Sequence, residues 1–355
     1  MSQPYVTEEQ AAMTAVRRAS QLASSVFNKL VKAETLTKDD KSPVTIADFA
    51  AQAVISTILH NAFPTDLIVG EEDASELRSP NNAEEREMRE RIISLANEAL
   101  TSELMLGDNP TWGIGPGTAK SDSEILDAID RGNYQGGSQG RMWTIDPIDG
   151  TKGFLRGDQY AVCVSLIVDA QVHVGVLGCP NLQKNPEHPE EGNGCMFVAI
   201  RGQGTRQMTL SGSNPTFVKI PPTNSPESLF LLESVDPSHS SHSFNSTVSN
   251  LLKITQPSVR MDSQAKYGSL ARSGGIYMRM PTGAGYKEKI WDHAPGSIII
   301  EEAGGVVSDS RGEPLNFGLG RTLGDNFGVI ACGKDTHSGV LTAVQQALQE
   351  EKSKA

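Results

Sequence analysis

The sequence lacks a long apolar run and contains little cysteine or aromatic side chain. Aromatic residues make up 5% of its 355 residues, and there are four cysteines. No segment reaches the roughly 18 apolar residues that a membrane-spanning helix needs, so no membrane partner is predicted. The cysteines are widely spaced, at Cys163, Cys179, Cys195 and Cys332. Without a C-x-x-C pair, we expect buried reduced thiols and neither a disulfide framework nor a zinc site.

Basic residues are outnumbered by acidic ones: the sequence has 31 Lys and Arg residues and 43 Asp and Glu residues, which gives a formal net charge of -12. Such a field repels nucleic acid, and no basic stripe offsets it. An anionic substrate would therefore need local cations, of which bound metal ions are the obvious source. The N-terminus, "MSQPYVTEEQ", shows no secretory signal, so a cytoplasmic protein is expected, and we predict a monomer.

Periodicity predicts helices in the first part of the chain. Apolar residues recur at helical spacing between Glu8 and Val31, and a second helix starts near Thr45 and stops before Pro64. "DLIVGEE" is typical of a short buried strand that leads into two glutamates. Further helices are predicted around residues 84–100 and 122–130.

Strands dominate the middle of the chain. "YAVCVSLIVDA", "QVHVGVLGCP" and "CMFVAIRGQGT" predict an antiparallel meander after a strand that starts at Met142. The Pro- and Ser-rich segment 211–228 is the best candidate boundary, and beyond it strands alternate with helices. We therefore expect an α+β domain (residues 1–215), an α/β domain (residues 216–355) and an active site between them.

Acidic residues stand at four places where a regular element is expected to begin or end. They are Asp48, the pair Glu71 and Glu72, the pair Asp146 and Asp149, and Asp292. Each has a structural explanation: Asp48 follows Thr45 at the spacing of a helix capping box, Asp149-Gly150 is an ordinary turn dipeptide, and Asp292 could cap a helix. Singly, none of these signals is strong.

Together the carboxylates favour a magnesium site. Mg²⁺ prefers a few carboxylates and completes its shell with water and substrate phosphates. We expect the strand to end at Ile145, and Asp146 and Asp149 then flank a turn stiffened by Pro147. Both carboxylates and the Ile148 carbonyl can therefore converge on one volume. Two ions about 3.5–4 Å apart would need a bridging acid such as Asp146. The site would suit phosphate ester hydrolysis, with Asp48 polarising the Thr151 hydroxyl against the attacking water.

Three motifs, "VGEE" at 69–72, "DPIDGT" at 146–151 and "WDHAPG" at 291–296, resemble the signatures of the inositol monophosphatase superfamily of lithium-sensitive, Mg²⁺-dependent phosphatases. The resemblance covers most of the chain and implies a layered αβαβα sandwich of the inositol monophosphatase and fructose-1,6-bisphosphatase type. It implies two or three Mg²⁺ ions. The residues that match the metal ligands are Glu71, Asp146, the Ile148 carbonyl, Asp149 and Asp292. Asp48 and Thr151 match the water-activating pair, and Glu72 is a weaker candidate.

Further segments, including "HSSH" at 239–242, "DSQAKY" at 262–267 and "YKEKIWDHA" at 286–294, are similar to the fungal 3'(2'),5'-bisphosphate nucleotidases. That branch converts adenosine 3',5'-bisphosphate to AMP and phosphate, which clears a by-product of sulfate assimilation, and it also acts on 3'-phosphoadenylyl sulfate. The resemblance implies substrate contacts from Thr151, His239, Ser263, Lys266 and Arg279.

Simpler explanations stay open for these substrate residues. Ser263 could be only the N-cap of a helix through about Arg272, and Lys266 and Arg279 could be surface cations. In an acidic protein that must hold a second phosphate, Lys266 and Arg279 become plausible as the residues that bind it. The alternative functions are an inositol monophosphatase or inositol polyphosphate 1-phosphatase, and, more remotely, a non-catalytic metal-binding protein.

Overall fold

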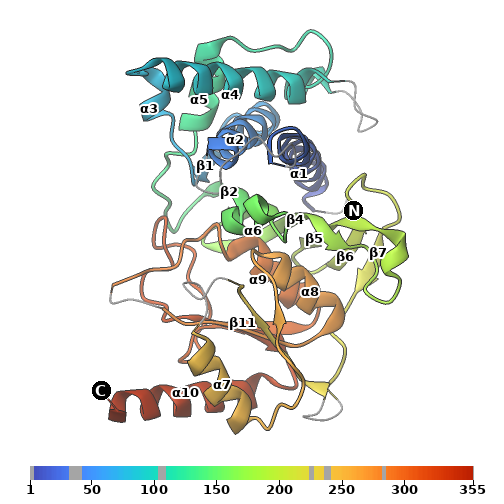
Figure 1. Cartoon of the computed structure of the whole chain (residues 1–355), viewed down its shortest axis with the longest axis vertical. Coiled ribbons are helices and arrows are strands. Elements are labelled where there is room, and N and C mark those ends of the chain that lie inside the picture. The colour runs from blue at the N-terminus through green and yellow to red at the C-terminus, as the bar shows by residue number, and fades with distance from the viewer. Residues whose placement is uncertain are drawn as a thin grey trace.

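Helices and sheets alternate through the molecule in layers (Figure 1). The protein is described here by a computed structural model, which covers residues 4–31, 42–102, 109–223, 228–235, 241–281 and 285–354. From one end to the other, the layers are α3–α5, then α1 and α2, the first sheet, α8 and α9, the second sheet, and finally α7 and α10. The expected layered αβαβα sandwich is confirmed, with α3–α5 added outside the α1–α2 layer.

The first sheet has seven strands within the described residues, in the order β1-β2-β3-β4-β5-β6-β7. They are β1 (Leu67–Gly70), β2 (Arg141–Asp149), β3 (Ala161–Val168), β4 (Gln171–Gln183), β5 (Asn193–Ile200), β6 (Gly204–Thr209) and β7 (Thr216–Val218). β1 pairs parallel to β2, and the later strands follow one another antiparallel, as the meander predicted. In β3–β5 side chains alternate between two covered faces, which explains why these central strands are largely apolar.

The second sheet has the order β11-β12-β10-β8-β9. Its strands are β8 (Leu231–Glu233), β9 (Val259–Arg260), β10 (Ile276–Arg279), β11 (Gly305–Ser308) and β12 (Val329–Gly333). The expected division at residue 215 stays a prediction, although β7 lies just beyond it and still pairs with the first sheet.

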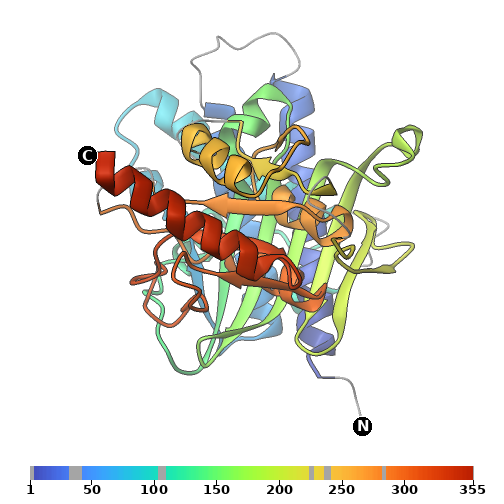
Figure 2. The same cartoon turned by 90° about the horizontal axis from the view of Figure 1, so that it is seen from below.

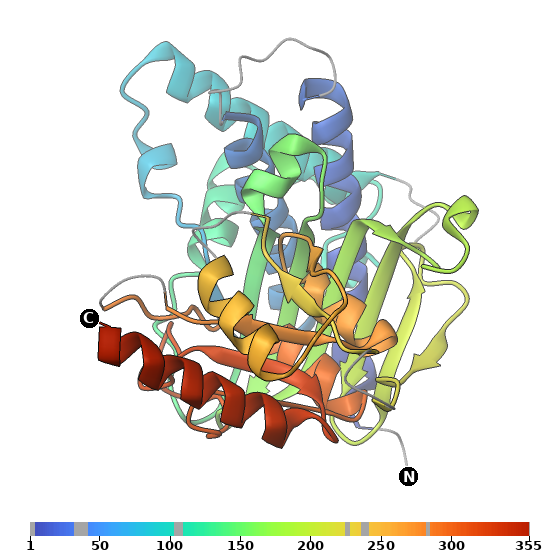
Figure 3. The ribbon, with the colours of Figure 1, turned by 60° about the horizontal axis from the view of Figure 1, so that its bottom comes forward.

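The helices of the first half lie on one side of the first sheet, with α1 and α2 against it and α3–α5 outside them. They are α1 (Val6–Val26), which continues as a π-turn (Phe27–Val31), α2 (Ser42–Ala62), α3 (Ser75–Arg78), α4 (Ala83–Thr101), a 3₁₀ turn (Pro110–Trp112) and α5 (Asp122–Asp130). Figure 3 shows α1 and α2 behind this sheet. A capping box between Ser121 and Glu124 starts α5 at the predicted residue. Within the described residues, no helix is both long and apolar enough to cross a membrane.

Of the remaining helices, α8 and α9 fill the space between the sheets, α7 and α10 cover the second sheet, and α6 packs against α2. They are α6 (Thr151–Arg156), a 3₁₀ turn (Pro189–Glu191), α7 (His242–Leu251), α8 (Ala265–Ser273), α9 (Ala294–Glu302) and α10 (His337–Lys354). Figure 2 shows α7 and α10 lying across the outer face of the second sheet. Three apolar cores result: one between the first sheet and α1–α5, one between the two sheets around α8 and α9, and one beneath α7 and α10.

Two local expectations were wrong. α2 begins at Ser42, so Asp48 lies in its second turn and not at a capping position after Thr45. β2 does not end before Asp146 but continues to Asp149, because β3 pairs with Asp146 and again with Asp149. The four cysteines are free and buried, as predicted.

Candidate active site

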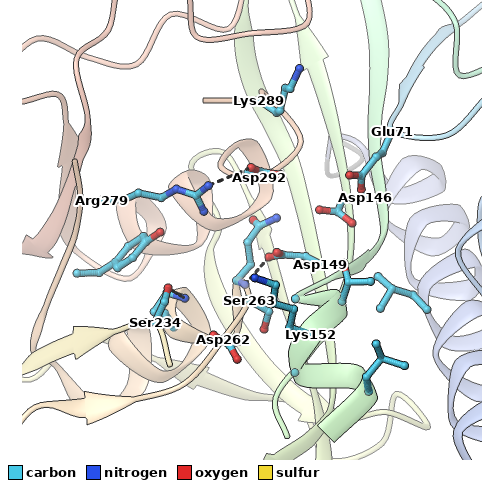
Figure 4. A pocket seen from close by; sticks show the side chains of 18 of the residues that line it. Glu71, Asp146, Asp149, Lys152, Ser234, Asp262, Ser263, Arg279, Lys289 and Asp292 are labelled. Carbon is cyan, nitrogen blue, oxygen red and sulfur yellow. Dashed lines mark hydrogen bonds and ion pairs between the residues drawn. The ribbon is translucent and has the colours of Figure 1, made fainter. Parts of the chain in front are cut away.

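The register of two parallel strands brings the first pair of carboxylates together. Gly70, the last residue of β1, lies opposite Ile145 of β2. Because parallel strands end at the same edge of a sheet, Glu71 and Asp146 emerge side by side there. Figure 4 shows their side chains next to each other.

A β-bulge adds Asp149 to this pair. The pairing with β3 shifts register between Asp146 and Asp149, so that one extra residue of β2 is accommodated there. Residues three apart on a regular strand point to opposite faces, but the extra residue lets both carboxylates face one cavity. Pro147 suits a bulge because it has no N–H to leave unpaired. The acids therefore converge through a bulge in the strand, where the sequence indicated a turn.

The turn after β2 lies against Ser263 and Gln264, so that the "DSQAKY" segment comes close to these acids. Gly150 precedes α6 with φ 87°, a left-handed conformation that favours glycine. A Cβ at this position would come within 2.8 Å of the Ser263 Cβ, so a side chain would push the two segments apart. The Gln264 backbone N–H donates a hydrogen bond to Asp149 Oδ2. Thr151 begins α6.

A cavity of about 460 Å³ gathers the predicted residues from both halves of the chain. It is lined by all five predicted metal-binding positions and by four predicted substrate residues: Glu71, Asp146, Ile148, Asp149, Thr151, Ser263, Lys266, Arg279 and Asp292. We call Glu71, Asp146, Asp149 and Asp292 the acidic wall, and Lys266 and Arg279 the cationic wall. Lys152 and Lys289 add two further basic side chains to the lining.

The acidic wall is electrostatically crowded. Burial and the nearby Glu71 raise the pKa of Asp146 well above its ordinary value. Burial and Asp292 raise the pKa of Glu71 to about 8 and that of Asp149 to about 6. The Glu71 side chain also meets the solvent of the cavity. Four carboxylates that repel one another need either protons or a cation between them.

The acidic wall fits a hard divalent cation. Asp146 Oδ1 is fully buried and has no hydrogen-bond partner within the described chain. An unpartnered carboxylate oxygen in the interior is costly, and a metal ion would satisfy it. Carboxylates together with a backbone carbonyl, that of Ile148, form the all-oxygen donor set that Mg²⁺ prefers.

A second group of possible ligands does not fit a metal. Atoms of Glu288, Asp292 and His293 lie within 4.8 Å of one another. His293 Nε2 is 3.1 Å from Glu288 Oε2, and its Nδ1 is 2.8 Å from the Tyr267 hydroxyl. Glu288 also pairs with Arg279 at 2.8 Å. Both ring nitrogens are thus engaged, and the arginine supplies the positive charge that a metal would bring.

The cationic wall lies opposite, on α8 and at the end of β10. Lys266 is buried, and its Nζ donates hydrogen bonds to Ser234 Oγ and the Met261 carbonyl, both at 3.2 Å. Burial lowers its pKa to about 8, although the Asp149 carboxylate acts in the opposite direction. Arg279 lies 3.8 Å from Asp292, which is the point where the two walls meet (Figure 4).

The predicted water-activating pair is arranged less directly. Asp48 is buried on α2, and burial, Glu72 and Glu71 raise its pKa. It also acts electrostatically on Asp146. Thr151 lines the cavity, but no hydrogen bond joins it to Asp48 among the described residues. The roles of this pair stay predictions.

One predicted substrate residue, His239, lies outside the described residues. His242, the second histidine of "HSSH", starts α7, and its Nε2 is 3.2 Å from the carbonyl oxygen of Ser234. The same Ser234 binds Lys266 through its hydroxyl. His242 therefore contacts Ser234, just after β8, and the same residue holds Lys266 of the cationic wall.

Sequence reasoning assigned no role to Gln264, which connects both halves of the site. Its side chain donates to the Trp291 carbonyl at 2.8 Å and accepts from the Gly296 N–H at 3.2 Å. Ser263 does not cap α8 as its N-cap residue, because Gln264 holds that place; the Ser263 hydroxyl accepts from the Ala265 N–H. Gln264 is part of the motif "DSQAKY", but only the fold shows which atoms it contacts.

The sequence pattern of the inositol monophosphatase family matches residues 6–349. The chain belongs to this family. Two solved structures have a fold similar to that of this chain, and their low sequence identity limits the comparison to the fold. An inositol monophosphatase from Zymomonas mobilis is 19% identical, with 97% of this chain and all of that chain covered and a TM-score of 0.59. One from Thermotoga maritima is 17% identical, with 95% and 96% covered and a TM-score of 0.57.

Curated relatives within the family are more similar. A 3'(2'),5'-bisphosphate nucleotidase from Schizosaccharomyces pombe is 46% identical, with 96% of this chain and 95% of the relative covered. One from Emericella nidulans is 43% identical, with 97% and 99% covered. One from Oryza sativa is 40% identical, with 99% and 97% covered. The protein is therefore an enzyme, a phosphatase that acts on a phosphate monoester.

Proposed function

We propose that the protein is a Mg²⁺-dependent phosphatase that hydrolyses the 3'-phosphate of adenosine 3',5'-bisphosphate, with AMP and phosphate as products. The observation that carries this proposal is the single cavity in which an acidic wall faces two buried or half-buried cations. A monophosphate needs only the first wall, whereas a bisphosphate uses both. The names of the curated relatives support the same substrate.

In this proposal the acidic wall and the Ile148 carbonyl hold two or three Mg²⁺ ions. The metal supplies Lewis acidity and a more acidic water, and it neutralises the phosphate. Asp48 accepts a proton through the Thr151 hydroxyl from the water that adds to the 3'-phosphorus. The bond between phosphorus and the ribose 3'-oxygen then breaks, and that oxygen takes up a proton. Lys266 and Arg279 hold the second phosphate by charge-assisted hydrogen bonds.

Two extensions belong to the same proposal. The enzyme also converts 3'-phosphoadenylyl sulfate to adenylyl sulfate, because the reacting 3'-phosphate is the same, and so serves sulfate assimilation in the cytoplasm. Lithium inhibits it by taking the place of one Mg²⁺. Insensitivity of phosphate release to millimolar lithium would count against this extension.

The experiment compares substrates under identical conditions. Phosphate release with Mg²⁺ is measured from adenosine 3',5'-bisphosphate, inositol 1-phosphate and inositol 1,4-bisphosphate. We expect the nucleotide to give the highest kcat/KM. Comparable or faster turnover of inositol 1-phosphate would favour an inositol phosphatase instead, and no turnover of any substrate in the presence of Mg²⁺ would favour a non-catalytic metal-binding protein.

A further inference from the structure

Glu288 is a buried acid in the loop before α9, beside the cavity but not on its lining. Its Oε1 accepts a hydrogen bond from Arg279 Nε at 2.9 Å, and its Oε2 lies 2.8 Å from the same nitrogen. Oε2 also lies 3.1 Å from His293 Nε2. A buried carboxylate with this many polar contacts is held in one orientation, and so are the groups that it contacts.

The direction of each hydrogen bond follows from the charge of Glu288. Burial would raise the pKa of this carboxyl, but the hydrogen bond from His293 and the charge of Arg279 outweigh it, and the pKa lies below its ordinary value. An ionised carboxylate only accepts, so His293 Nε2 carries the proton. The other ring nitrogen, Nδ1, lies 2.8 Å from the Tyr267 hydroxyl and shares a hydrogen bond with it. Tyr267, fully buried on α8, thus anchors the series of bonds that ends at Arg279.

Arg279 is consequently held through two nitrogens of its guanidinium group, Nε and Nη2. Its Nε is taken up by Glu288, and its Nη2 lies 3.2 Å from the Tyr286 hydroxyl and 3.8 Å from Asp292. Arg279 also interacts with Tyr277, and its side chain lines the cavity. An arginine side chain loses rotamer entropy when it is ordered. Ordering before the ligand arrives removes that cost from binding.

We propose that Glu288 is a positioning residue that sets the selectivity for a second phosphate, because it holds the Arg279 guanidinium in the orientation that receives this group. The inference rests on the proposed function, in which Arg279 binds the second phosphate of a nucleoside bisphosphate. Glu288 itself touches neither the substrate nor the acidic wall in this arrangement.

A purely structural role for Glu288 makes a different prediction. The backbone carbonyl of Glu288 accepts a hydrogen bond from the Leu323 N–H at 2.8 Å, and this contact anchors the loop whatever the side chain is. If the side chain only stabilised the loop, its replacement would lower stability and reduce activity on all substrates alike. A selectivity role changes the ratio between substrates.

The test compares Glu288→Gln with the wild type on two nucleotides that share the 3'-phosphate. Adenosine 3',5'-bisphosphate carries the second phosphate, and 3'-AMP lacks it. We expect KM for the bisphosphate to rise about tenfold, the equivalent of about 1.4 kcal/mol, with kcat changed less than about twofold. KM for 3'-AMP should change less than about twofold. An equal loss on both nucleotides, or an unchanged ratio, overturns the proposal.

A double-mutant cycle tests whether Glu288 acts through Arg279. On an Arg279→Lys background, which lacks the Nε–H that Glu288 holds, Glu288→Gln should cost little further selectivity. Additive effects overturn the proposal. If Glu288→Gln fails to fold, Glu288→Asp, which keeps the charge, and Tyr286→Phe, which removes the Nη2 contact, take its place. A smaller shift of the same selectivity ratio is then expected from both, and no shift in either overturns the proposal.

The wild-type arm separates this inference from the proposed function. A wild type that turns over inositol 1-phosphate as well as the adenosine bisphosphate removes the proposed function whatever the variants do. A wild type that prefers the bisphosphate, combined with a Glu288→Gln enzyme of the same preference, removes only the inference about Glu288.

Discussion

The acidic wall and the cationic wall of the cavity are built in opposite ways. The acidic wall brings together carboxylates that repel one another, and Asp146 Oδ1 is left without a partner among the described residues. The cationic wall consists of two side chains that each have protein partners, Ser234 and Met261 for Lys266 and Glu288 for Arg279. One wall is incomplete without a cation, whereas the other is already ordered by the protein.

This difference separates two tasks. Mutual repulsion in the acidic wall provides a driving force for metal binding, because a bound cation relieves it. Prior ordering in the cationic wall lowers the cost of binding a second anionic group. Changes to the acidic wall should therefore affect metal binding and turnover, while changes to the cationic wall should affect mainly the choice of substrate.

The largest effect is expected from Asp149→Asn. The loss of one charge from the acidic wall weakens Mg²⁺ binding, and a metal contributes several kcal/mol of transition-state stabilisation. Phosphate release from adenosine 3',5'-bisphosphate should fall by about 1,000-fold or more. Mg²⁺ titration followed by calorimetry should show weaker binding. Asp127→Asn, at an exposed aspartate that pairs with Arg78 on another side of the molecule, is the matched control. Wild-type turnover by Asp149→Asn would remove the metal site from this wall.

A smaller loss of turnover is expected from Asp48→Asn. Removal of a general base typically costs about 10²- to 10⁴-fold, and we expect a value near the lower limit because the acidic wall remains intact. The Mg²⁺ concentration that gives half-maximal activity should change less than about threefold, in contrast to Asp149→Asn. If that concentration rises as much as in Asp149→Asn, Asp48 acts on the metal and not on the proton.

A change in substrate choice is expected from Lys266→Met. A hydrogen bond to a charged group contributes about 1.5–3 kcal/mol, so kcat/KM for the bisphosphate should fall at least about tenfold. The loss for 3'-AMP should be clearly smaller. Lys120→Met, at a lysine that pairs with Glu124 outside the cavity, is the control for a change of net charge. Equal losses on both nucleotides would show that Lys266 does not distinguish the second phosphate.

The smallest effect concerns stability and pH. The pKa of Glu71 is raised from 4.5 to about 8, and that of Asp149 from 3.8 to about 6, so the folded protein retains protons that the unfolded chain loses. Stability of the metal-free protein is therefore highest below pH 4 with respect to these groups, and it falls as pH rises from about 4 to 8. Tm measured in EDTA should drop by several degrees over this range.

Mg²⁺ should reverse this loss, because it replaces the protons between the carboxylates. The rise in Tm on addition of Mg²⁺ should be larger at pH 8 than at pH 5. Asp149→Asn should show a flatter pH dependence in EDTA. A Tm rise that is the same at both pH values would contradict the view that the acidic wall holds the metal.

Local patterns in the sequence predicted most of the secondary structure. The helix from Asp122 to Asp130 was predictable because its capping box and apolar spacing are both contained within the element. The start of α2 was not, because Thr45 and Asp48 have capping spacing although they lie inside the helix. The bulge in β2 was also missed: pairing with β3 lengthens the strand, and the sequence of β2 alone contains only the proline that allows it.

The candidate site was predictable to the extent that its residue types are unusual. Carboxylates at element ends and the motif around Asp146 pointed to cation chemistry before any contact was known, and the structure places them on one cavity. Gln264 and Glu288 were not found, because a glutamine or a glutamate near a motif has many ordinary explanations. Their significance depends on which atoms they contact across the fold.

By itself, the sequence determined the class of chemistry and the residue types of the acids, because clustered charge is a local property of the chain. Its resemblance to a known family implied the layered architecture. Only the tertiary structure decided that the end of β1 and the bulge of β2 bring Glu71, Asp146 and Asp149 onto one cavity. It also decided that Arg279 faces them from the second sheet with Glu288 behind it. Strand register and long-range hydrogen bonds set these contacts, and neither is encoded within a single stretch of residues.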